Sequence, residues 1–429
     1  MREALTALNQ RFGCRLFVVA LGDPKRPYDG GKVGPWAATL DELARELDSI
    51  IIVSAGNRAP RSGNRLEQAI TEYPDYLLEP ANRLCEPAGA MNVLTVGALA
   101  HGEGIGPDLA EHVHIRPITR AFEPAPFTRI GPGIGGSIKP DLVDIGGTMV
   151  FDPAVARLRL GEDLPTAGVL TLHHRFLDRL FTAGSGTSYA APRVAHKAAQ
   201  ILARFPGASA NLVRALLAGA ARIPDEAQLR LQTLGDDAVR SICGHGAVDS
   251  ERAAYSDDHR VVLYAEDELA LDHFAVYQLP IPEPFQSGGR RSIRVTLAFD
   301  PPVRHTRADY AGIGMNFRLL RGCDPDLIFE HFRRRTQEEG RQPDIDSRFD
   351  CDLKPGPRER ERGTLQTASV TFTRGTEAYG DNYYLVVRCD GGWAGTFETQ
   401  QRFAVVVELT HQAEVQLYER LRARVRVQG

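Results

Sequence analysis

A glycine-rich turn that leads into a helix constrains the fold of this chain most strongly. It spans residues 184–192 and has the sequence GSGTSYAAP. A helix is predicted over residues 189–205, because apolar residues then recur on one helical face: Val194, Ala195, Ala198, Ile201 and Leu202. Ser188 is thereby placed at the helix N-terminus, where the helix dipole and free backbone N–H groups favour a developing oxyanion. A serine in this setting is a candidate nucleophile for acyl transfer.

The same position has a simpler interpretation. Serine and threonine are common N-cap residues before an apolar helix, so capping alone also accounts for Thr187 or Ser188. Helical spacing does not separate a cap from a nucleophile.

A second turn of small residues follows a predicted buried strand. Residues 51–57 read IIVSAGN, an apolar β-branched run that ends in the side-chain amide of Asn57. An asparagine amide can donate a hydrogen bond to a tetrahedral oxyanion, and the loss of one such donor costs about 2.7–4 kcal/mol of transition-state stabilisation.

Both segments resemble motifs of the subtilases, the subtilisin-like serine peptidases. Residues 186–192 are similar to the subtilase nucleophile motif, and residues 51–57 to the oxyanion-hole segment. Weaker similarities follow the subtilase order at residues 15–22, 92–98, 139–143 and 244–249. The resemblance implies a serine endopeptidase that acts on peptide or protein substrates through an acyl-enzyme, without a cofactor or metal.

The resemblance also assigns roles to individual residues. Ser188 would be the nucleophile, and Asn57 would donate to the oxyanion. The substrate cleft would be lined by two strand ends, with these residues: Ala20, Leu21, Gly22, Ser54, Ala55 and Gly56.

The chain departs from the subtilase pattern before residue 15. A subtilase orders its triad as Asp, His and Ser, and both partners would precede the strand at Arg15. Residues 1–14, MREALTALNQRFGC, contain neither and predict a short amphipathic helix. His101, followed by glycine, lies in a stretch typical of a surface loop. The catalytic domain is therefore expected to be incomplete and to have an exposed sheet edge, which points either to a separate chain that supplies Asp and His or to an incomplete chain. The alternative is an inactive pseudoprotease fragment that binds extended peptides or a partner chain.

Two domains are expected, an incomplete subtilisin-like α/β domain with a helix-flanked parallel sheet over residues 1–254 and a β-sandwich, jelly-roll-like, over 255–429. Period-two alternation predicts half-buried antiparallel strands at 293–299, 368–372 and 403–409. A polar helix is expected over residues 327–337, and residues 355–361 (PGPRERE) predict a solvated loop.

Charge and cysteine content exclude several classes of protein. The net charge of −4 favours neither nucleic acid nor a membrane as a partner. Six scattered cysteines without Cys-x-x-Cys pairs suit reduced thiols. No signal peptide or long apolar run is evident, so a cytoplasmic protein is expected.

Overall fold

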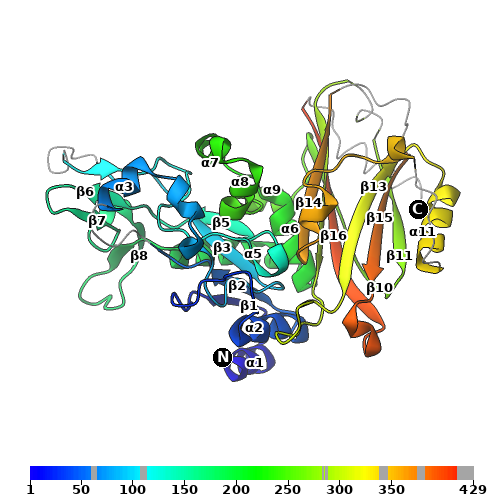
Figure 1. Ribbon diagram of the computed structural model, residues 1–429, viewed down its shortest axis with the longest axis horizontal. Helices are drawn as coiled ribbons and strands as arrows, with labels where there is room; N and C mark the ends of the chain where they lie inside the picture. Colours follow the sequence, from blue (N-terminus) through cyan, green and yellow to red (C-terminus); the bar gives the residue numbers. More distant parts are fainter. Residues whose placement is uncertain are drawn as a thin grey trace. The chain divides into compact units, whose positions relative to one another are not determined.

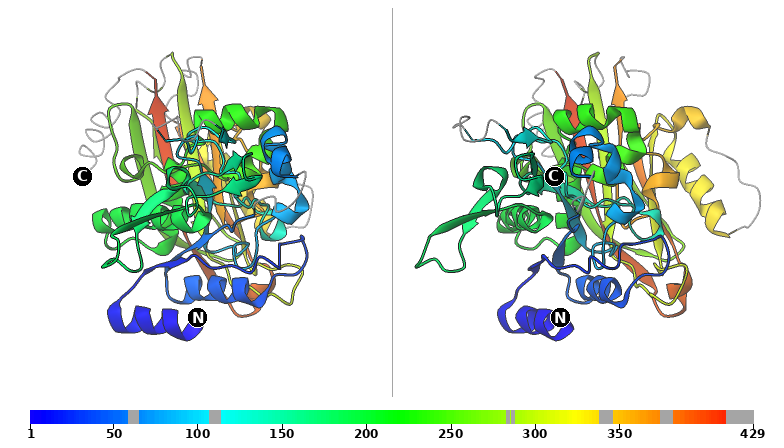
Figure 2. Two further views of the ribbon diagram at one scale, coloured as in Figure 1. Left: turned by 90° about the vertical axis from the view of Figure 1, so that its left-hand side faces the viewer. Right: turned by 60° about the vertical axis from the view of Figure 1, so that its left-hand side comes forward.

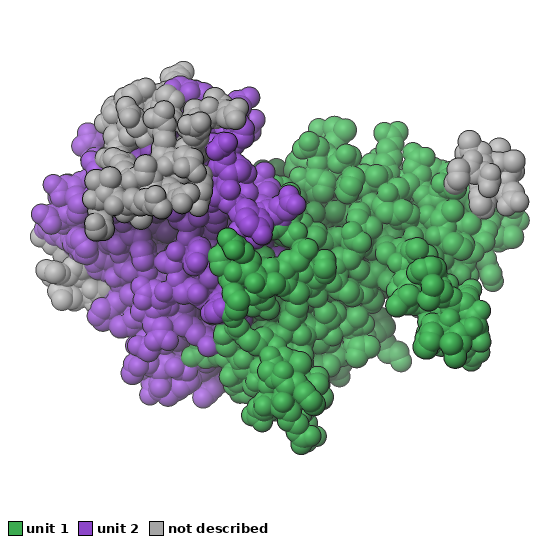
Figure 3. Space-filling model, turned by 180° about the vertical axis from the view of Figure 1, so that it is seen from behind, with its two compact units in different colours: residues 1–206, 220–250, 305–310 green, residues 207–219, 251–304, 311–429 purple. Residues whose placement is uncertain are grey.

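The computed structural model describes residues 1–58, 65–106, 114–282, 285, 288–337, 346–373 and 382–412. The chain forms two compact units (Figures 1 and 3). Unit 1 comprises residues 1–206, 220–250 and 305–310, and unit 2 comprises 207–219, 251–304 and 311–429.

Unit 1 is built on a parallel sheet with the strand order β1-β2-β3-β5. The strands are β1 (Leu16–Val19), β2 (Ile50–Ser54), β3 (Leu94–Leu99) and β5 (Leu142–Ile145). β2 and β3 are buried at every position, as expected for parallel strands covered on both faces. β1 lies at one edge and pairs with β2 alone among the described strands, from Leu16 opposite Ile50 to Val19 opposite Val53.

Helix α5 (Thr187–Arg204) packs against all four parallel strands (Figure 1). Its buried residues include Val194, Ala198 and Ile201, which confirms the predicted apolar face. The predicted first helix is α1 (Arg2–Phe12), which packs against α2 (Pro35–Glu46).

The remaining elements of unit 1 are short. The helices are α3 (Arg65–Thr71), α7 (Asp225–Leu231) and α8 (Asp236–Cys243), and the antiparallel strands are β4 (Arg116–Pro117), β6 (Val150–Asp152), β7 (Arg157–Arg159), β8 (Val169–Leu172) and β9 (Phe181–Gly184). β8 and β9 form a hairpin that extends away from the rest of unit 1 (Figure 2). One face of this hairpin carries the exposed side chains of Leu170, Leu172 and Phe181.

Unit 2 contains two antiparallel sheets, with the orders β10-β16-β12-β14 and β11-β15-β13. Their strands are β10 (Arg260–Ala270), β11 (Phe274–Pro280), β12 (Arg291–Phe299), β13 (Gly314–Arg321), β14 (Leu365–Phe372), β15 (Asn382–Asp390) and β16 (Gln400–His411). One apolar core takes residues from both sheets, among them Leu297 and Phe317. β12, β14 and β16 confirm the three strands predicted from alternation.

The helices of unit 2 confirm one prediction and correct another. α11 (Pro325–Gln337) matches the expected polar helix, and α9 (Ser250–Ala254) is a single short turn. Residues 355–361 were predicted to be a solvated loop, but they contain the short helix α12 (Pro357–Arg360). The Arg360 side chain is buried because its guanidinium donates to the carbonyls of Phe317 (2.7 Å) and Pro355 (3.2 Å).

The two units interleave along the sequence. Most of α6 (Ala210–Ala220) belongs to unit 2, where the buried guanidinium of Arg214 donates to the carbonyl of Phe299 (3.0 Å) and the hydroxyl of Thr364 (2.9 Å). Residues 305–310 return to unit 1. The division into domains at residues 254 and 255 stays a prediction from the sequence.

Residues 305–310 supply a partner to a buried carboxylate of unit 1. Asp41, on α2, accepts hydrogen bonds from the Met91 N–H (2.9 Å), the Asn92 N–H (2.7 Å) and the Tyr310 hydroxyl (2.6 Å). Burial raises the pKa of Asp41, and the hydrogen bonds only partly oppose this.

The raised pKa of Asp41 predicts how stability depends on pH. The unfolded carboxyl has a pKa near 3.8. Because the folded pKa is higher, the stabilisation from Asp41 is complete below pH 3.8 and is lost as the pH rises through the folded pKa. In the variant Asp41→Asn, residue 41 carries an amide, which does not titrate. As the pH rises, the unfolding free energy of the wild type should therefore fall relative to that of this variant. Urea unfolding of both proteins across this range measures the difference, and a constant difference would contradict the prediction.

Candidate active site

The candidate site lies where the parallel strands of unit 1 end. Gly56 follows β2, and its N–H donates to the Thr187 hydroxyl at the start of α5 (3.0 Å). The Gly186 N–H donates to the carbonyl of Gly146, which follows β5 (2.8 Å). The start of α5 is therefore fixed at the carboxyl edge of the sheet, the usual position of a ligand site in an open α/β fold.

Thr187 and Ser188 both lie in the first turn of α5, but they differ in exposure. The helix begins at Thr187. Its N-cap residue is Gly186, which has no side chain that could cap the helix. Neither Thr187 nor Ser188 is thus the N-cap residue, contrary to the simpler interpretation of the sequence. Thr187 is fully buried, whereas Ser188 is partly exposed in the first turn, where backbone N–H groups have no intrahelical partner.

Asn57 is attached to the same helix terminus. Its Oδ1 accepts hydrogen bonds from the Thr187 N–H (2.8 Å) and from the Thr187 hydroxyl (3.1 Å). A backbone N–H can only donate, so the atom facing it must be the amide oxygen. This fixes the orientation of the Asn57 amide and leaves its NH₂ group to donate elsewhere.

Gly56 makes the turn before Asn57 possible. Its φ of +94° favours glycine, and a Cβ at this position would lie 2.8 Å from Cys85 Sγ and 2.9 Å from Arg129 Cδ. The Arg129 guanidinium in turn donates to the carbonyls of Ala81 (3.0 Å) and Arg83 (2.7 Å). Neither Cys85 nor Arg129 was singled out from the sequence, because each lies far from Gly56 along the chain.

The predicted cleft residues differ in exposure. Leu21 and Gly22, after β1, are exposed, and Ala20 is partly exposed. Ser54 and Ala55 are buried, and Gly56 is partly exposed. A substrate that lies between these two strand ends would meet the backbone of β2 rather than the side chains of Ser54 and Ala55.

Among the residues that the structure describes, no histidine forms a hydrogen bond with the Ser188 hydroxyl. His101 instead contacts the Thr166 carbonyl through Nε2 (2.9 Å), and His114 contacts the Asp152 carboxylate (3.3 Å). These two histidines are thereby engaged at other positions of unit 1.

A buried thiol lies beside the candidate site. Within the described ranges, no group of His, Cys, Asp and Glu side chains is arranged to hold a metal ion. The thiol of Cys85 is buried against Gly56. Burial raises the pKa of Cys85 despite the nearby charge of Arg129, so this sulfur stays protonated and is a weak nucleophile.

Comparisons with known proteins agree with the motifs. The model of the Subtilase family matches residues 3–246. The uncharacterized protein y4bN of Sinorhizobium fredii (strain NBRC 101917 / NGR234) is 68% identical over 427 residues, which cover 99% of each chain.

Solved proteases are also similar, at lower identity. A protease from Pseudoalteromonas arctica matches 56% of this chain and 50% of its own chain, with 18% identity and a TM-score of 0.34. MycP1 without its N-terminal propeptide matches 60% of this chain and 65% of its own, with 18% identity and a TM-score of 0.33. This chain thus spans between one half and two thirds of the length of these solved structures.

Proposed function

The chain belongs to the subtilase family, and on that premise we propose that it is a serine endopeptidase whose nucleophile is Ser188. The observation that carries the proposal is the attachment of Asn57 to the first turn of α5. It brings an amide donor, a partly exposed serine and the N-terminal turn of a helix to one end of the sheet.

In the proposed reaction, Ser188 Oγ attacks the scissile carbonyl carbon and the hydroxyl proton passes to a general base. The Asn57 NH₂ group and the Ser188 N–H donate to the oxyanion that forms on the carbonyl oxygen. The base returns the proton to the leaving amine, and water then hydrolyses the acyl-enzyme. Positive potential at the N-terminus of α5 favours the oxyanion.

We also propose that a separate chain supplies the triad Asp and His. The edge strand β1 supports this. Among the described strands, only β2 pairs with it, so the backbone groups on its outer side can pair with an added strand. A second candidate function uses the same edge without catalysis. In that case the protein binds extended peptides or a partner chain, and the observation that no described histidine is hydrogen-bonded to Ser188 favours it.

A fluorophosphonate probe separates the two candidates. We expect the full chain to be labelled at Ser188, alone or after co-production with a subtilase segment that carries the Asp strand and the His helix. Ser188→Ala should abolish labelling. Ser185→Ala is the matched control, because the Ser185 hydroxyl is buried and bonded to the Gly161 N–H (2.9 Å) and the Ala167 carbonyl (3.0 Å). Mass spectrometry locates the label, and its absence in both preparations would refute the peptidase and favour the binding function.

Two further proposals concern the cellular location of the protein and the fold of unit 2. We place the protein in the cytoplasm, on the support of six cysteines that are all unpaired. In the described residues, no helix is both long and apolar enough to cross a bilayer. We further propose that unit 2 is a β-sandwich, which the core shared by its two sheets supports.

A further inference from the structure

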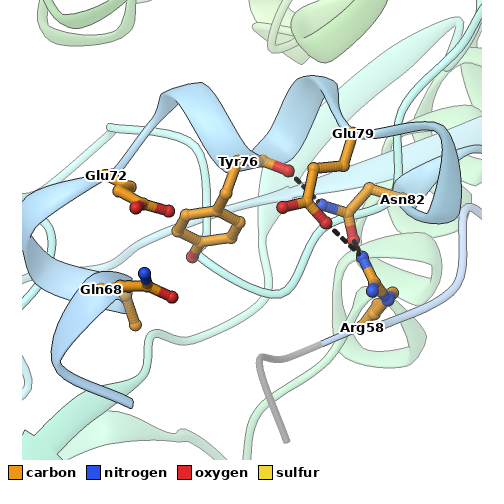
Figure 4. Close-up of a pocket in the computed structure, with 7 residues that line it drawn as sticks. Arg58, Gln68, Glu72, Tyr76, Glu79 and Asn82 are labelled. Atoms are coloured by element: carbon orange, nitrogen blue, oxygen red, sulfur yellow. Dashed lines mark hydrogen bonds and ion pairs between the residues drawn. The ribbon is translucent and has the colours of Figure 1, made fainter. Parts of the chain in front are cut away.

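A polar cavity of about 260 Å³ begins one residue after Asn57. Its lining comes from Arg58, from α3 and from the segment that follows α3, with these residues: Arg58, Gln68, Ala69, Glu72, Tyr76, Glu79 and Asn82 (Figure 4). The cavity is smaller than a typical pocket for a drug-sized ligand, which starts at roughly 300 Å³. It is suited to a single side chain.

The described residues that line the cavity carry more negative than positive charge. Among these residues, the positive charge comes from Arg58. Its guanidinium is paired with Glu79 (3.2 Å) and also donates to the side-chain oxygen of Asn82 (3.0 Å). Figure 4 shows the Glu72 carboxylate directed toward the same space from the other side. In the described part of the chain, Glu72 forms no ion pair. Within this described lining, one carboxylate therefore remains without a cation.

The walls of the cavity are held in place. The Tyr76 hydroxyl donates to the Pro126 carbonyl (2.6 Å), and the Asn82 amide donates to the Tyr76 carbonyl. The Arg58 N–H donates to the Phe127 carbonyl (2.7 Å), which fixes the backbone of this lining residue. A preformed, charged cavity recognises its ligand without reorganisation.

We propose that this cavity binds a lysine or arginine side chain of the polypeptide that Ser188 attacks. The proposal rests on the proposed peptidase function and adds the class of substrate. Arg58, which lines the cavity, directly follows Asn57 in the chain, so the cavity begins at the residue next to the proposed oxyanion donor. A cation there pairs with Glu72, whereas a neutral side chain would leave this carboxylate without a partner.

Binding to an inactive variant tests the cavity independently of catalysis. We would measure the fluorescence polarisation of dye-labelled nonapeptides with full-length Ser188→Ala protein. The peptides carry arginine or its neutral isostere citrulline at the central position, with alanine at all other positions. We expect the arginine peptide to bind roughly twofold to fivefold more tightly, as for an ion pair with an exposed carboxylate. Adding Glu72→Gln should remove most of this preference.

The matched control is Glu67→Gln, which removes an exposed carboxylate of α3 outside the cavity. It should leave the preference for arginine unchanged. Equal binding of both peptides, no binding of either, or a preference that survives Glu72→Gln would overturn the proposal. If arginine is preferred but Ser188 resists fluorophosphonate both in the chain alone and after co-production with the subtilase segment, the cavity stands and the peptidase function fails.

Discussion

Asn57→Asp is expected to slow the acylation of Ser188 by roughly 100- to 1000-fold without destabilising the protein. The carboxylate that this variant introduces keeps an oxygen acceptor for the Thr187 N–H and hydroxyl, which Asn57 Oδ1 provides in the wild type. A negative charge at a helix N-terminus is itself favourable. The change removes the NH₂ donor and replaces it with an oxygen that repels the developing oxyanion. The second-order rate of fluorophosphonate labelling, together with thermal unfolding, measures both effects.

Asn57→Ala separates the two functions of this amide. It removes the donor and the acceptor together, so it should lose labelling and also about 1 kcal/mol of stability, as for a lost helix cap. A labelling rate for Asn57→Asp equal to that of the wild type would show that Asn57 is not an oxyanion donor. A loss of stability as large as that of Asn57→Ala would show that the Thr187 contacts are assigned incorrectly.

Lys139→Met is expected to destabilise unit 1 by about 3–5 kcal/mol. The Lys139 ammonium is 1% exposed and donates to the Asp141 carboxylate (2.5 Å) and the Val93 carbonyl (2.8 Å). Asp141 is 2% exposed and also accepts from the Thr95 N–H of β3 (2.6 Å). Methionine fills similar space but leaves this carboxylate buried without its cation. Unfolding is followed in a Trp393→Phe background, where Trp36 of α2 is the remaining tryptophan and reports on unit 1.

Lys197→Met is the matched control for the buried pair. Lys197 donates to the Asp144 carboxylate (2.6 Å), but its side chain is partly exposed, and Arg193 contacts the same carboxylate (2.9 Å). Asp144 therefore keeps a cation, and the loss should be about 1 kcal/mol or less. Equal losses in the two variants would contradict the distinction between a buried and a compensated ion pair.

The sequence was sufficient to predict the elements that meet at the candidate site. Apolar β-branched residues at 50–53 and the helical spacing after Ser188 depend on local periodicity, and both elements are present as β2 and α5. The order of the parallel strands was accessible only through the resemblance. The alternation in unit 2 predicted β12, β14 and β16 for the same local reason.

Contacts between distant residues were not predicted. The bond between Asn57 and Thr187 spans 130 residues, and it decides which end of the amide is available to a substrate. Glu72 and Arg58 are ordinary charged residues in the sequence. Only the folded structure shows that both line one cavity. Arg360 was assigned to a solvated loop because charge normally indicates exposure, but two carbonyl acceptors compensate its burial. Side-chain hydrogen bonds of this kind produce no periodic pattern in the sequence.

The return of residues 305–310 to unit 1 limits how this protein can recombine during evolution. The chain passes between the units after residues 206, 219, 250, 304 and 310, so neither unit is encoded by an uninterrupted stretch of gene. A recombination that exchanged everything after residue 254 would remove Tyr310 from Asp41 as well as replacing the sheets of unit 2. The buried carboxylate would then lose a donor in a position that water does not reach. The β-sheet half is therefore expected to be passed on together with the subtilase half, and not gained or lost as a separate cassette.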